Sequence, residues 1–584
     1  MKKLILSTLM LAATLTMSAI PAKREWRTVS QSDGTKVTLM LVGDENFHCY
    51  QTTDGVPVIE ENGNYYYANA IGNYLQKTDM LAHDAEMRSF QESQAIAQFG
   101  NEEDINRMWK AAPNMQHLRP HRAIGEANGV YEGSKKGIII LVSFNDLDFK
   151  DENAKDLYNN IANTPGYKYN SKSIGSVHDY FTDQSNGKFD LTFDVVGPYK
   201  APKSVKYYGE NSYGGDQHGR IVELLKFACN SADAEVDFKD YDWDGDGNVD
   251  QVFMLYAGEG EATGGPSYTI WPHESYIGSG PLTAFYLDGV RINTYACSNE
   301  LTYNTLSGIG TFCHEFTHCL GLPDFYDITE NSGNQNANYA MGPYDLMCSG
   351  SYNGDSWKPA AYTAYERNFC GWMDLTELTD PIKVEGMKPI TDGGEAYVMY
   401  NPGNRNEYYI MEHRNNISSW DRGLPGKGLL IYHVNYIPSR WKDNSVNVGD
   451  TPCMAVVPAD NIANSSTTRN DLYPYKNIMG GENSNLFSDD SKPAATLYNA
   501  NTDGTKLLHV KVSDITYTTS SKTISFVFND GAISKINSIG NDDNTTELYN
   551  LNGVKLGNNI DINTLPKGLY IVKSKDKSQK IAIQ

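Results

Sequence analysis

Apolar and polar residues alternate along the first part of the chain in a way that is typical of strands. Residues 35 to 75 include "TKVTLMLVGDENFHCYQTTDGVPVIEENGNYYYA", in which the alternation is broken by DG and NG turns, and this predicts β-hairpins. Residues 84 to 110 are polar with helical spacing. A Pro/Gly/Asn-rich linker follows, in which Arg119 and Arg122 are expected to be exposed to processing. The pattern predicts a separate leading module over residues 23–130.

A different pattern begins at "GIIILVSFND", residues 137 to 146, a continuous apolar run that is typical of a strand buried on both faces. The elements predicted after it are a helix from Ser173 to Asp183, a strand at 188–196, a helix at 219–230 and an apolar strand from Val252. Strands that alternate with helices predict an α/β core with a twisted sheet over residues 131–375.

Beyond residue 375 the segments are β-like and separated by turns, as in "EYYIMEHR", "GLLIYHV" and "TISFVF". They predict a β-rich, sandwich-like extension over residues 376–530. A last short unit, residues 535–584, contains "ELYNLNGVKL" and "KGLYIVK". The expected fold class is therefore α+β and multidomain, as a length of 584 residues also requires.

The first 22 residues have the features of a secretory signal peptide. Two lysines precede an apolar stretch from Leu4 to Met17, and Ala19 or Ala22 closes it as a small residue. The apolar stretch is too short to span a bilayer, and no other segment approaches transmembrane length. We expect an exported protein, with residues 1–22 as its leader.

Charge and cysteine content narrow the choice of partners and scaffold. A net charge of -23 disfavours nucleic acid and anionic membrane surfaces as partners. Eight cysteines are few for an exported chain of this length, so disulfides are not expected to be its main scaffold. Cys313 and Cys319 would lie about 9 Å apart along one helix, too far to bridge. Other pairings stay open.

The stretch "CHEFTHCLGLPDFYD", residues 313 to 327, carries the strongest chemical signal. His314 and His318 stand four apart, so one helical face can present both imidazoles to a single metal ion. Glu315 lies about 100° round the helix, close enough to reach a metal-bound water without ligating the metal. The apolar residues on the opposite face are Ile309, Phe312, Phe316 and Leu320, which predicts a buried helix.

The residues after the second histidine predict the third ligand. Gly321 favours a helix end, and Pro323 prevents the helix from resuming. The chain must then turn back, which carries Asp324 toward the histidines. The alternative is a zinc peptidase whose third ligand is a distant glutamate, and it needs a helix that continues; here the helix is expected to stop too soon.

Two residues beyond this helix are candidate parts of the same site. "YDLMCSG", residues 344 to 350, places Met347 in a turn-like stretch, where it could form an apolar floor beneath a zinc site of the Met-turn kind. Tyr352, just beyond, could support the oxyanion that forms during hydrolysis. Only sequence proximity points to Tyr352, so simple packing is the preferred interpretation.

The stretch "DYDWDGDGNVD" predicts a calcium loop, because oxygen-bearing side chains alternate around a glycine at the bend. The candidate ligands are Asp242, Asp244, Asp246, Asn248 and Asp250. Phe253 takes the place of the bidentate glutamate of an EF-hand, so the loop is not an EF-hand. An acidic surface loop without an ion is the alternative.

Three further residues are expected to be structural. Cys49 could occupy an open zinc position as a propeptide thiolate, but it lies in a predicted strand where a buried thiol packs as a small apolar group. His273 and His433 lie in apolar strands and are expected to be hydrogen-bonded core histidines rather than metal ligands.

These motifs, in this order and spacing, resemble the immune inhibitor A family of secreted metallopeptidases, a part of the metzincin clan. The resemblance covers roughly residues 135–445 and includes "SVHDYFTDQSNGKFDL", "DWDGDGNVDQVFMLYAG", "IWPHE", "HEFTHCLGLPDFYD" and "YDLMCSG". It implies a metzincin-like zincin domain with zinc on His314, His318 and Asp324, Glu315 as general base and Met347 in the Met-turn.

The same resemblance assigns roles to the two ends of the chain. The leading module looks like the family's propeptide, which keeps the enzyme latent. Residues 535–584 look like the C-terminal sorting domain of bacterial type IX secretion, which would engage the secretion machinery. The alternative for this short unit is a terminal β-domain with no addressing role.

The expected function is therefore a secreted or cell-surface zinc endopeptidase, made as a latent precursor and acting on proteins or peptides. In this hypothesis a metal-activated water attacks the peptide bond with Glu315 as the base. Zinc and calcium are the expected ions, and a monomer is the expected state. The competing hypothesis is a non-catalytic, metal-stabilised surface binding protein such as an adhesin.

Overall fold

The computed structural model describes most of the chain. The described residues are 17–18, 20–44, 47–72, 74–99, 101–111, 131–210, 217–278, 283–328, 340–449, 451–463, 466–476, 484–529, 547–550, 555–558, 565, 568–574 and 577–583. They form a mixed α+β structure with several sheets and few helices, which confirms the predicted class at this level. Arg119, Arg122 and most of the predicted leader lie outside the described residues.

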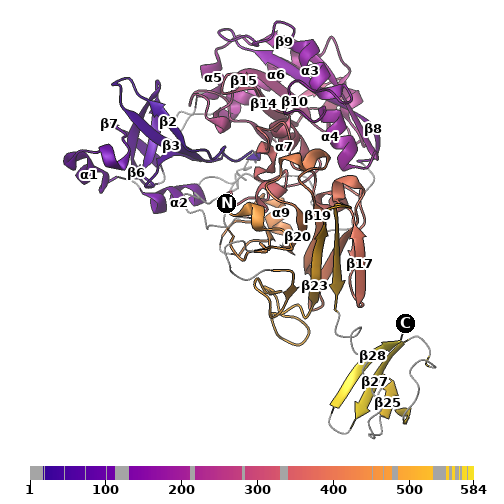
Figure 1. Ribbon diagram of the computed structural model, residues 1–584. Coiled ribbons are helices and arrows are strands. Elements are labelled where there is room, and N and C mark those ends of the chain that lie inside the picture. Colours follow the sequence, from indigo (N-terminus) through magenta and orange to yellow (C-terminus); the bar gives the residue numbers. More distant parts are fainter. Residues whose placement is uncertain are drawn as a thin grey trace, which may run out of the picture.

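The leading module is a six-stranded antiparallel sheet in the order β2-β3-β4-β5-β6-β7, drawn in indigo in Figure 1. Its strands are β2 (Arg27–Ser30), β3 (Lys36–Gly43), β4 (His48–Thr52), β5 (Pro57–Glu61), β6 (Asn64–Ile71) and β7 (Tyr74–Leu81). The predicted hairpins are present. The helical segment divides into α1 (Phe90–Ile96) and α2 (Glu102–Ala111).

The central sheet has the order β1-β11-β14-β10-β8-β9, with the short β15 (Thr305–Leu306) paired to β14. Its strands are β1 (Met17–Ser18), β8 (Gly133–Ser143), β9 (Phe189–Lys200), β10 (Val252–Glu259), β11 (His273–Tyr276) and β14 (Thr294–Thr302). Strands β9, β8, β10 and β14 run parallel, whereas β11 is antiparallel to β14. The predicted α/β alternation is therefore observed, and both β11 and the short β15 pair antiparallel with β14.

Helices cover both faces of this sheet (Figure 1). They are α3 (Ala154–Asn163), α4 (Val177–Gln184), α6 (Gln217–Ala232) and α7 (Gly310–His318). The predicted start of α4 at Ser173 is wrong by four residues. Ser176 caps the helix by accepting a hydrogen bond from the Asp179 amide, and the Asp179 side chain accepts one from the Ser176 amide in return.

Alternate side chains of β8 divide the interior into two cores, as expected for a strand buried on both faces. Ile139 and Leu141 join the core that contains α3, α4 and α7, whereas Ile138 and Ile140 join the core that contains α6. The first core continues past residue 375 and includes Ile410 of the extension.

The extension contains two packed sheets. The first has the order β16-β18-β19-β20-β21 and the second β17-β24-β23-β22. Their strands are β16 (Thr376–Glu377), β17 (Ile382–Met387), β18 (Ala396–Asn401), β19 (Asn404–Arg414), β20 (Gly428–Asn435), β21 (Met454–Val456), β22 (Phe487–Ser488), β23 (Lys511–Thr518) and β24 (Thr523–Phe528). One apolar cluster joins both sheets, which gives a sandwich-like arrangement.

The final unit is a separate four-stranded sheet, drawn in yellow in Figure 1. Its strands are β25 (Glu547–Asn550), β26 (Lys555–Asn558), β27 (Gly568–Ser574) and β28 (Lys577–Ile583). Among the described helices, none combines the length and apolar character that a membrane span requires.

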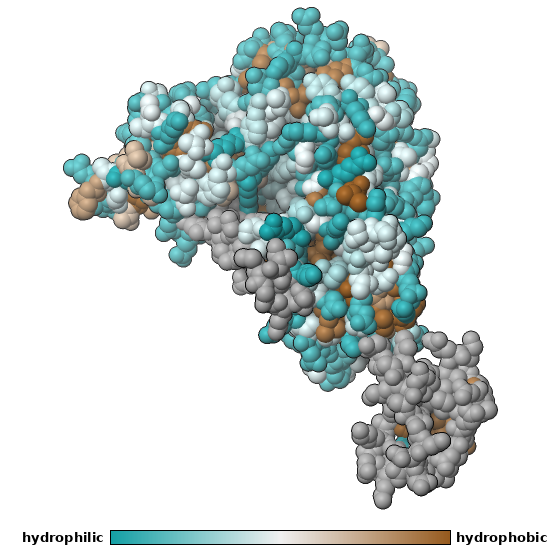
Figure 2. All heavy atoms as spheres, viewed as in Figure 1, coloured by the Kyte–Doolittle hydropathy of each residue, from teal (hydrophilic) through white to brown (hydrophobic). Residues whose placement is uncertain are grey.

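The leading module docks beside the edge strand β11. β1, which lies in the predicted leader, pairs antiparallel with β11 through Met17 and Ser18. His48 stacks on Trp271 with ring centroids 4.4 Å apart, and its Nε2 lies 2.9 Å from Oε1 of Glu261. The face of the molecule drawn in Figure 2 is mainly hydrophilic, with some apolar groups. The contacts beside β11 are therefore a strand addition by residues of the predicted leader and a buried imidazole–carboxylate contact made by the leading module.

The His48–Glu261 contact should make this docking depend on pH. Burial alone would lower the pKa of His48, but the charge of Glu261 and the hydrogen bond between them raise it. The protonated imidazole is therefore favoured in the docked state. Its contribution is complete below the pKa of a free histidine, about 6.5, and is lost as pH rises through the raised pKa.

We expect a chain nicked in the predicted linker to release its leading module more readily at about pH 9 than at about pH 6. Size-exclusion chromatography at the two pH values measures the release. His48→Gln should abolish the difference. His83→Gln is the matched control, because His83 pairs with Glu92 inside the leading module. Equal release by the unaltered chain at both pH values would contradict the prediction.

Candidate metal centre

The helix α7 is held in place by an aromatic core. Every residue from Gly310 to His318 is buried. The ring centroids of Phe312 and Phe253, on β10, lie 3.8 Å apart, and those of Phe316 and Phe193, on β9, lie 5.3 Å apart. The predicted core face, which also includes Ile309 and Leu320, is confirmed. The opposite face of the helix, which carries His314 and His318, is thereby held toward Asp324.

Backbone carbonyls orient both histidines. Nδ1 of His314 lies 2.9 Å from the carbonyl oxygen of Leu346, and Nδ1 of His318 lies 2.8 Å from that of Leu322. A carbonyl oxygen only accepts hydrogen bonds, so each Nδ1 must carry the proton. Each Nε2 is then left with a lone pair that faces the site, which is the form in which imidazole binds metals.

Asp324 reaches the two histidines because the chain reverses after the helix. Gly321 has φ of +93°, a conformation that glycine adopts easily. Oδ1 of Asp324 then lies 3.1 Å from Nε2 of His314 and 3.6 Å from Nε2 of His318. Ligands at zinc bond lengths in a tetrahedral site are separated by about 3.3 Å. The spacing therefore fits one zinc ion held by these three residues.

The polar atoms also fit a cation. His314 Nε2 and Asp324 Oδ1 are buried and have no hydrogen-bond partner among the described residues. Burial raises the pKa of the Asp324 carboxyl. Buried polar atoms that lack a partner are costly, and a bound cation removes that cost for this set of donors.

Asn444 holds the second oxygen of Asp324, a contact that no sequence motif predicts. Its side-chain amide nitrogen donates to Asp324 Oδ2 at 2.7 Å, and its Oδ1 accepts from the Asp324 backbone N–H at 2.7 Å. Asn444 lies in the extension, 120 residues after Asp324, so no local motif connects the two. This bidentate contact leaves Oδ1 of Asp324 directed at the histidines.

Met347 lies in a turn that is bonded to both sides of the site. Its side chain is fully buried, and its carbonyl oxygen accepts from the Phe325 N–H at 2.7 Å. Leu346, one residue earlier, accepts from His314. The turn therefore supports the segment that carries Asp324 and the first histidine together, and the role of Met347 as an apolar floor remains a prediction.

Glu315 lies beside the ligands and contacts the amino-terminal segment. Candidate ligand atoms of His314, Glu315 and His318 all lie within 4.8 Å of one another. Burial raises the pKa of Glu315 well above its usual range. The backbone N–H of Ile20 donates to Oε1 of Glu315 at 2.9 Å. The carboxylate is thus positioned against a peptide nitrogen that lies in the cleft.

Tyr352 also faces this segment. Its hydroxyl donates to the carbonyl oxygen of Pro21 at 2.5 Å, and burial raises its pKa, with the charge of Glu315 contributing. Trp271 donates through Nε1 to the carbonyl oxygen of Ile20 at 3.1 Å. The Tyr352 side chain is therefore within reach of a peptide carbonyl in the cleft, and its predicted role in oxyanion support remains a prediction.

The acidic loop is closed by its own hydrogen bonds. Asp242 accepts from the backbone N–H groups of Gly245, Asp246 and Gly247 at 2.9 to 3.1 Å. Ligand oxygens of Asp242, Asp244 and Asp246 lie within 4.8 Å of one another. Asn248 donates to Asp246 at 3.0 Å, and Asp250 accepts from the Trp243 N–H at 2.6 Å. The three aspartates converge, but Asp250 is used within the loop, so calcium binding remains a prediction.

The other candidate residues are structural in this arrangement. Cys49 packs in the core of the leading module, and burial raises its pKa to about 12, so it is a thiol and not a thiolate. His273 contacts Trp271 O and the Tyr295 hydroxyl, as expected of a core histidine. His433 contacts Glu407 at 3.0 Å. All eight cysteines are free.

Comparison with known proteins confirms the resemblance seen in the motifs. Residues 132–373 match the family described as "Immune inhibitor A peptidase M6, catalytic domain". "Pre-pro-metalloprotease PrtV" of Vibrio cholerae is 26% identical over 290 residues, which cover 43% of this chain and 31% of that protein. "Immune inhibitor A" of Bacillus thuringiensis is 25% identical over 299 residues, 42% of this chain and 41% of that protein.

A fungal relative, "Putative secreted metallopeptidase" of Arthroderma benhamiae, is 24% identical over 221 residues, 34% of this chain and 31% of that protein. The chain therefore spans about a third to two fifths of the length of these relatives. The similarity supports a metal-dependent peptidase domain in the matched segment.

Asn444→Ala should weaken zinc binding by about 10- to 100-fold, the range typical of residues that orient a ligand from behind. The substitution removes both hydrogen bonds that fix Asp324. Competition with a chromogenic chelator measures the affinity. Asn461→Ala is the matched control, because Asn461 is exposed and shares the positive φ of Asn444, +59° against +47°. Equal affinity of both variants and the unaltered protein would contradict the role of Asn444.

Proposed function

We propose that the protein is a secreted zinc-dependent endopeptidase that hydrolyses peptide bonds in proteins, because residues 132–373 match the catalytic domain of immune inhibitor A peptidases. One observation carries the proposal. Oδ1 of Asp324 lies 3.1 and 3.6 Å from the two histidine nitrogens, and the buried carboxylate of Glu315 lies beside them. Three ligands and an adjacent base are the parts that metal-assisted hydrolysis requires.

Zinc, when bound, supplies the Lewis acidity that polarises the scissile carbonyl and acidifies water. Glu315 takes the proton of the attacking water and returns it to the leaving amine. The amide nitrogen of Ile20 occupies the place of such an amine, 2.9 Å from Oε1. Tyr352 is placed to donate a hydrogen bond to a substrate carbonyl.

The site favours this function over a surface binding protein with purely structural metals. A structural zinc site is closed by four protein ligands. Here two imidazoles and one aspartate converge, and the neighbouring Glu315 contacts a peptide nitrogen in the cleft. A distant glutamate as third ligand is also disfavoured, because Asp324 already lies at ligand distance.

The leading module is proposed to keep the precursor latent by filling the cleft. Ile20 and Ala22 are buried, and the segment between them is bonded to Glu315, Trp271 and Tyr352. A peptide held in this way excludes a substrate from the base. Removal of the leader after Ala22 would discard these contacts, whereas removal after Ala19 would keep them. We therefore favour Ala19 as the end of the leader.

The proposed location is outside the cell. The leader directs export, and the β25–β28 sheet of the final unit is proposed as the sorting domain of a type IX-like pathway. The calcium loop at Asp242, Asp244 and Asp246 is proposed to stabilise the edge of the catalytic domain. Support for calcium comes from the convergence of three carboxylates in the loop that precedes β10.

Glu315→Gln should lower the cleavage of an unfolded protein substrate by about 10²- to 10⁴-fold, because it removes the base but keeps the size of the side chain. Zinc content, measured by elemental analysis, should not change. Glu385→Gln on the exposed surface is the control and should retain full activity. An unchanged cleavage rate in Glu315→Gln with zinc bound would refute the assignment of the base.

Calcium added to chelator-treated protein should raise its melting temperature by about 2–4 °C for each kcal/mol of binding, with no change in zinc content. Differential scanning calorimetry measures the shift. Asp242→Asn should abolish it, and the exposed Asp380→Asn should not. A melting temperature that calcium leaves unchanged would leave the loop as an acidic turn without an ion.

A further inference from the structure

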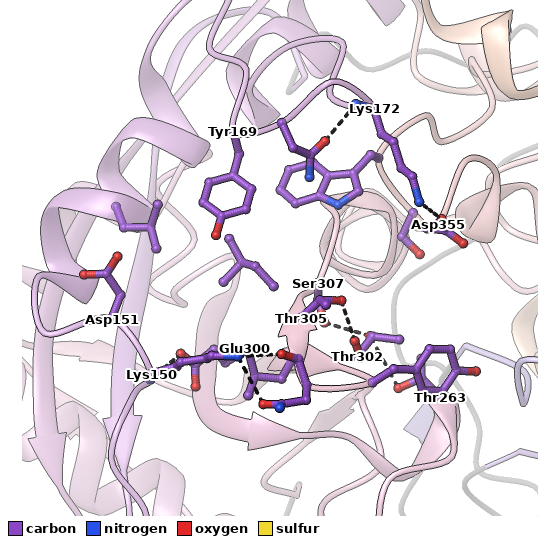
Figure 3. Close-up of a pocket in the computed structure, with 18 of the residues that line it drawn as sticks. Lys150, Asp151, Tyr169, Lys172, Thr263, Glu300, Thr302, Thr305, Ser307 and Asp355 are labelled. Atoms are coloured by element: carbon purple, nitrogen blue, oxygen red, sulfur yellow. Dashed lines mark hydrogen bonds and ion pairs between the residues drawn. The ribbon is translucent and has the colours of Figure 1, made fainter.

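A cavity of about 720 Å³ opens where the amino-terminal segment leaves the metal centre. Its walls come from the end of β14 with β15 and from the loops 169–172 and 355–357, and Lys23 of the leading module also lines it. Figure 3 shows the Tyr169 ring reaching into the cavity, with Glu300 at its base and the Lys172–Asp355 pair at its rim. The cavity therefore lies mainly in the catalytic segment, and Lys23 of the leading module forms part of its wall.

The amino-terminal segment connects the base to this cavity. Ile20 donates to Glu315, and Pro21 accepts from Tyr352. Lys23 then donates through its backbone N–H to the carbonyl oxygen of Ala262 at 2.8 Å. These contacts use only backbone atoms of the segment, so a substrate of any sequence could repeat them. Ile20 stands where the residue after the cleaved bond would stand, and Lys23 is then the fourth residue after that bond.

The Lys23 ammonium lies near a carboxylate and an aromatic ring, both of which attract cations. Its Nζ is 3.8 Å from Oδ1 of Asp355 and 5.1 Å from the centre of the Tyr303 ring. The side chain is only 9% exposed. Its nearest anion, Glu25 at 3.0 Å, belongs to the leading module and departs with it. Asp355 and Tyr303 remain in the catalytic segment, so the mature enzyme keeps a carboxylate and an aromatic ring for a cation.

The ring of Tyr303 accepts both kinds of basic side chain. The guanidinium of Arg27 lies 3.8 Å from the ring centre, on the same tyrosine that Lys23 approaches. Lys150 at the base of the cavity donates to the Asn304 carbonyl oxygen at 2.6 Å and keeps its positive charge. Asp355 also pairs with Lys172 at the exposed rim. Asp355 and the Tyr303 ring therefore favour lysine or arginine over glutamate at this position.

We propose that this cavity binds the part of a polypeptide substrate that follows the cleaved bond, and that Asp355 and Tyr303 select a lysine or arginine as its fourth residue. The proposal rests on the proposed peptidase function and names its substrate class. Lys23 occupies this position in the precursor as a substrate side chain would. The stacked pair of Tyr169 and Trp357, with ring centroids 5.5 Å apart, forms the opposite apolar wall.

Three internally quenched peptides that differ only at this fourth residue, lysine, alanine or glutamate, test the proposal. The full chain is activated with trypsin at the predicted linker, and the trypsin is then blocked with a serine-protease inhibitor. We expect kcat/KM for the lysine peptide to exceed that for the alanine peptide by about fivefold, with the glutamate peptide slowest. Asp355→Asn should remove the lysine advantage, measured as the ratio of kcat/KM for the lysine peptide to kcat/KM for the alanine peptide.

A charge-reversal variant distinguishes a change of selectivity from a loss of activity that misfolding causes. Asp355→Lys should reverse the order and favour the glutamate peptide, a gain that a damaged protein cannot produce. The exposed Asp374→Asn is the matched control and should keep the original order. Equal kcat/KM for the lysine and alanine peptides with the unaltered enzyme would overturn the proposal but leave the peptidase standing. Failure to cleave any peptide, with zinc bound, would instead overturn the proposed function.

Discussion

The reversal of the chain between His318 and Asp324 is the constraint on which the metal centre depends. If α7 continued, each residue would advance by about 1.5 Å, and residue 324 would stand about 9 Å beyond His318 along the axis. Instead Gly321 takes a positive φ and Asp324 returns to 3.1 Å from His314. The other supports follow from this return, because Leu346, Met347 and Asn444 all hold parts of the reversed chain or its partner histidine.

The extension supports the centre as well as following it in sequence. Arg414 on β19 is fully buried and donates to the carbonyl oxygens of Tyr344 and Ala361, on either side of the Met347 turn. Asp421 neutralises it at 2.6 Å, and loss of one partner from such a buried pair costs about 3–5 kcal/mol. The apolar core likewise crosses residue 375 without a break. The metal centre and the extension therefore form one cooperative body.

Local patterns predicted the parts of this protein that local forces determine. The alternation in the leading module predicted its hairpins, the apolar run predicted β8, and the spacing of His314, Glu315 and His318 with the Gly321 turn predicted a convergence that the distances support. Contacts between distant segments were beyond reach. Nothing near Asn444 distinguishes it from other loop asparagines, and the contact of Ile20 with Glu315 joins residues that are 295 positions apart in the sequence. The helix α4 begins four residues later than predicted, because Ser176 and Asp179 form a capping box that starts it at Val177.

The position of Asn444 has a consequence for the order in which the candidate centre is synthesised and folds. The histidines and Asp324 leave the ribosome 120 residues before the side chain that completes their geometry. In the proposed peptidase, a nascent chain that lacks Asn444 would therefore hold Asp324 without this support. The candidate centre would reach its final geometry only after the extension has been synthesised and has folded.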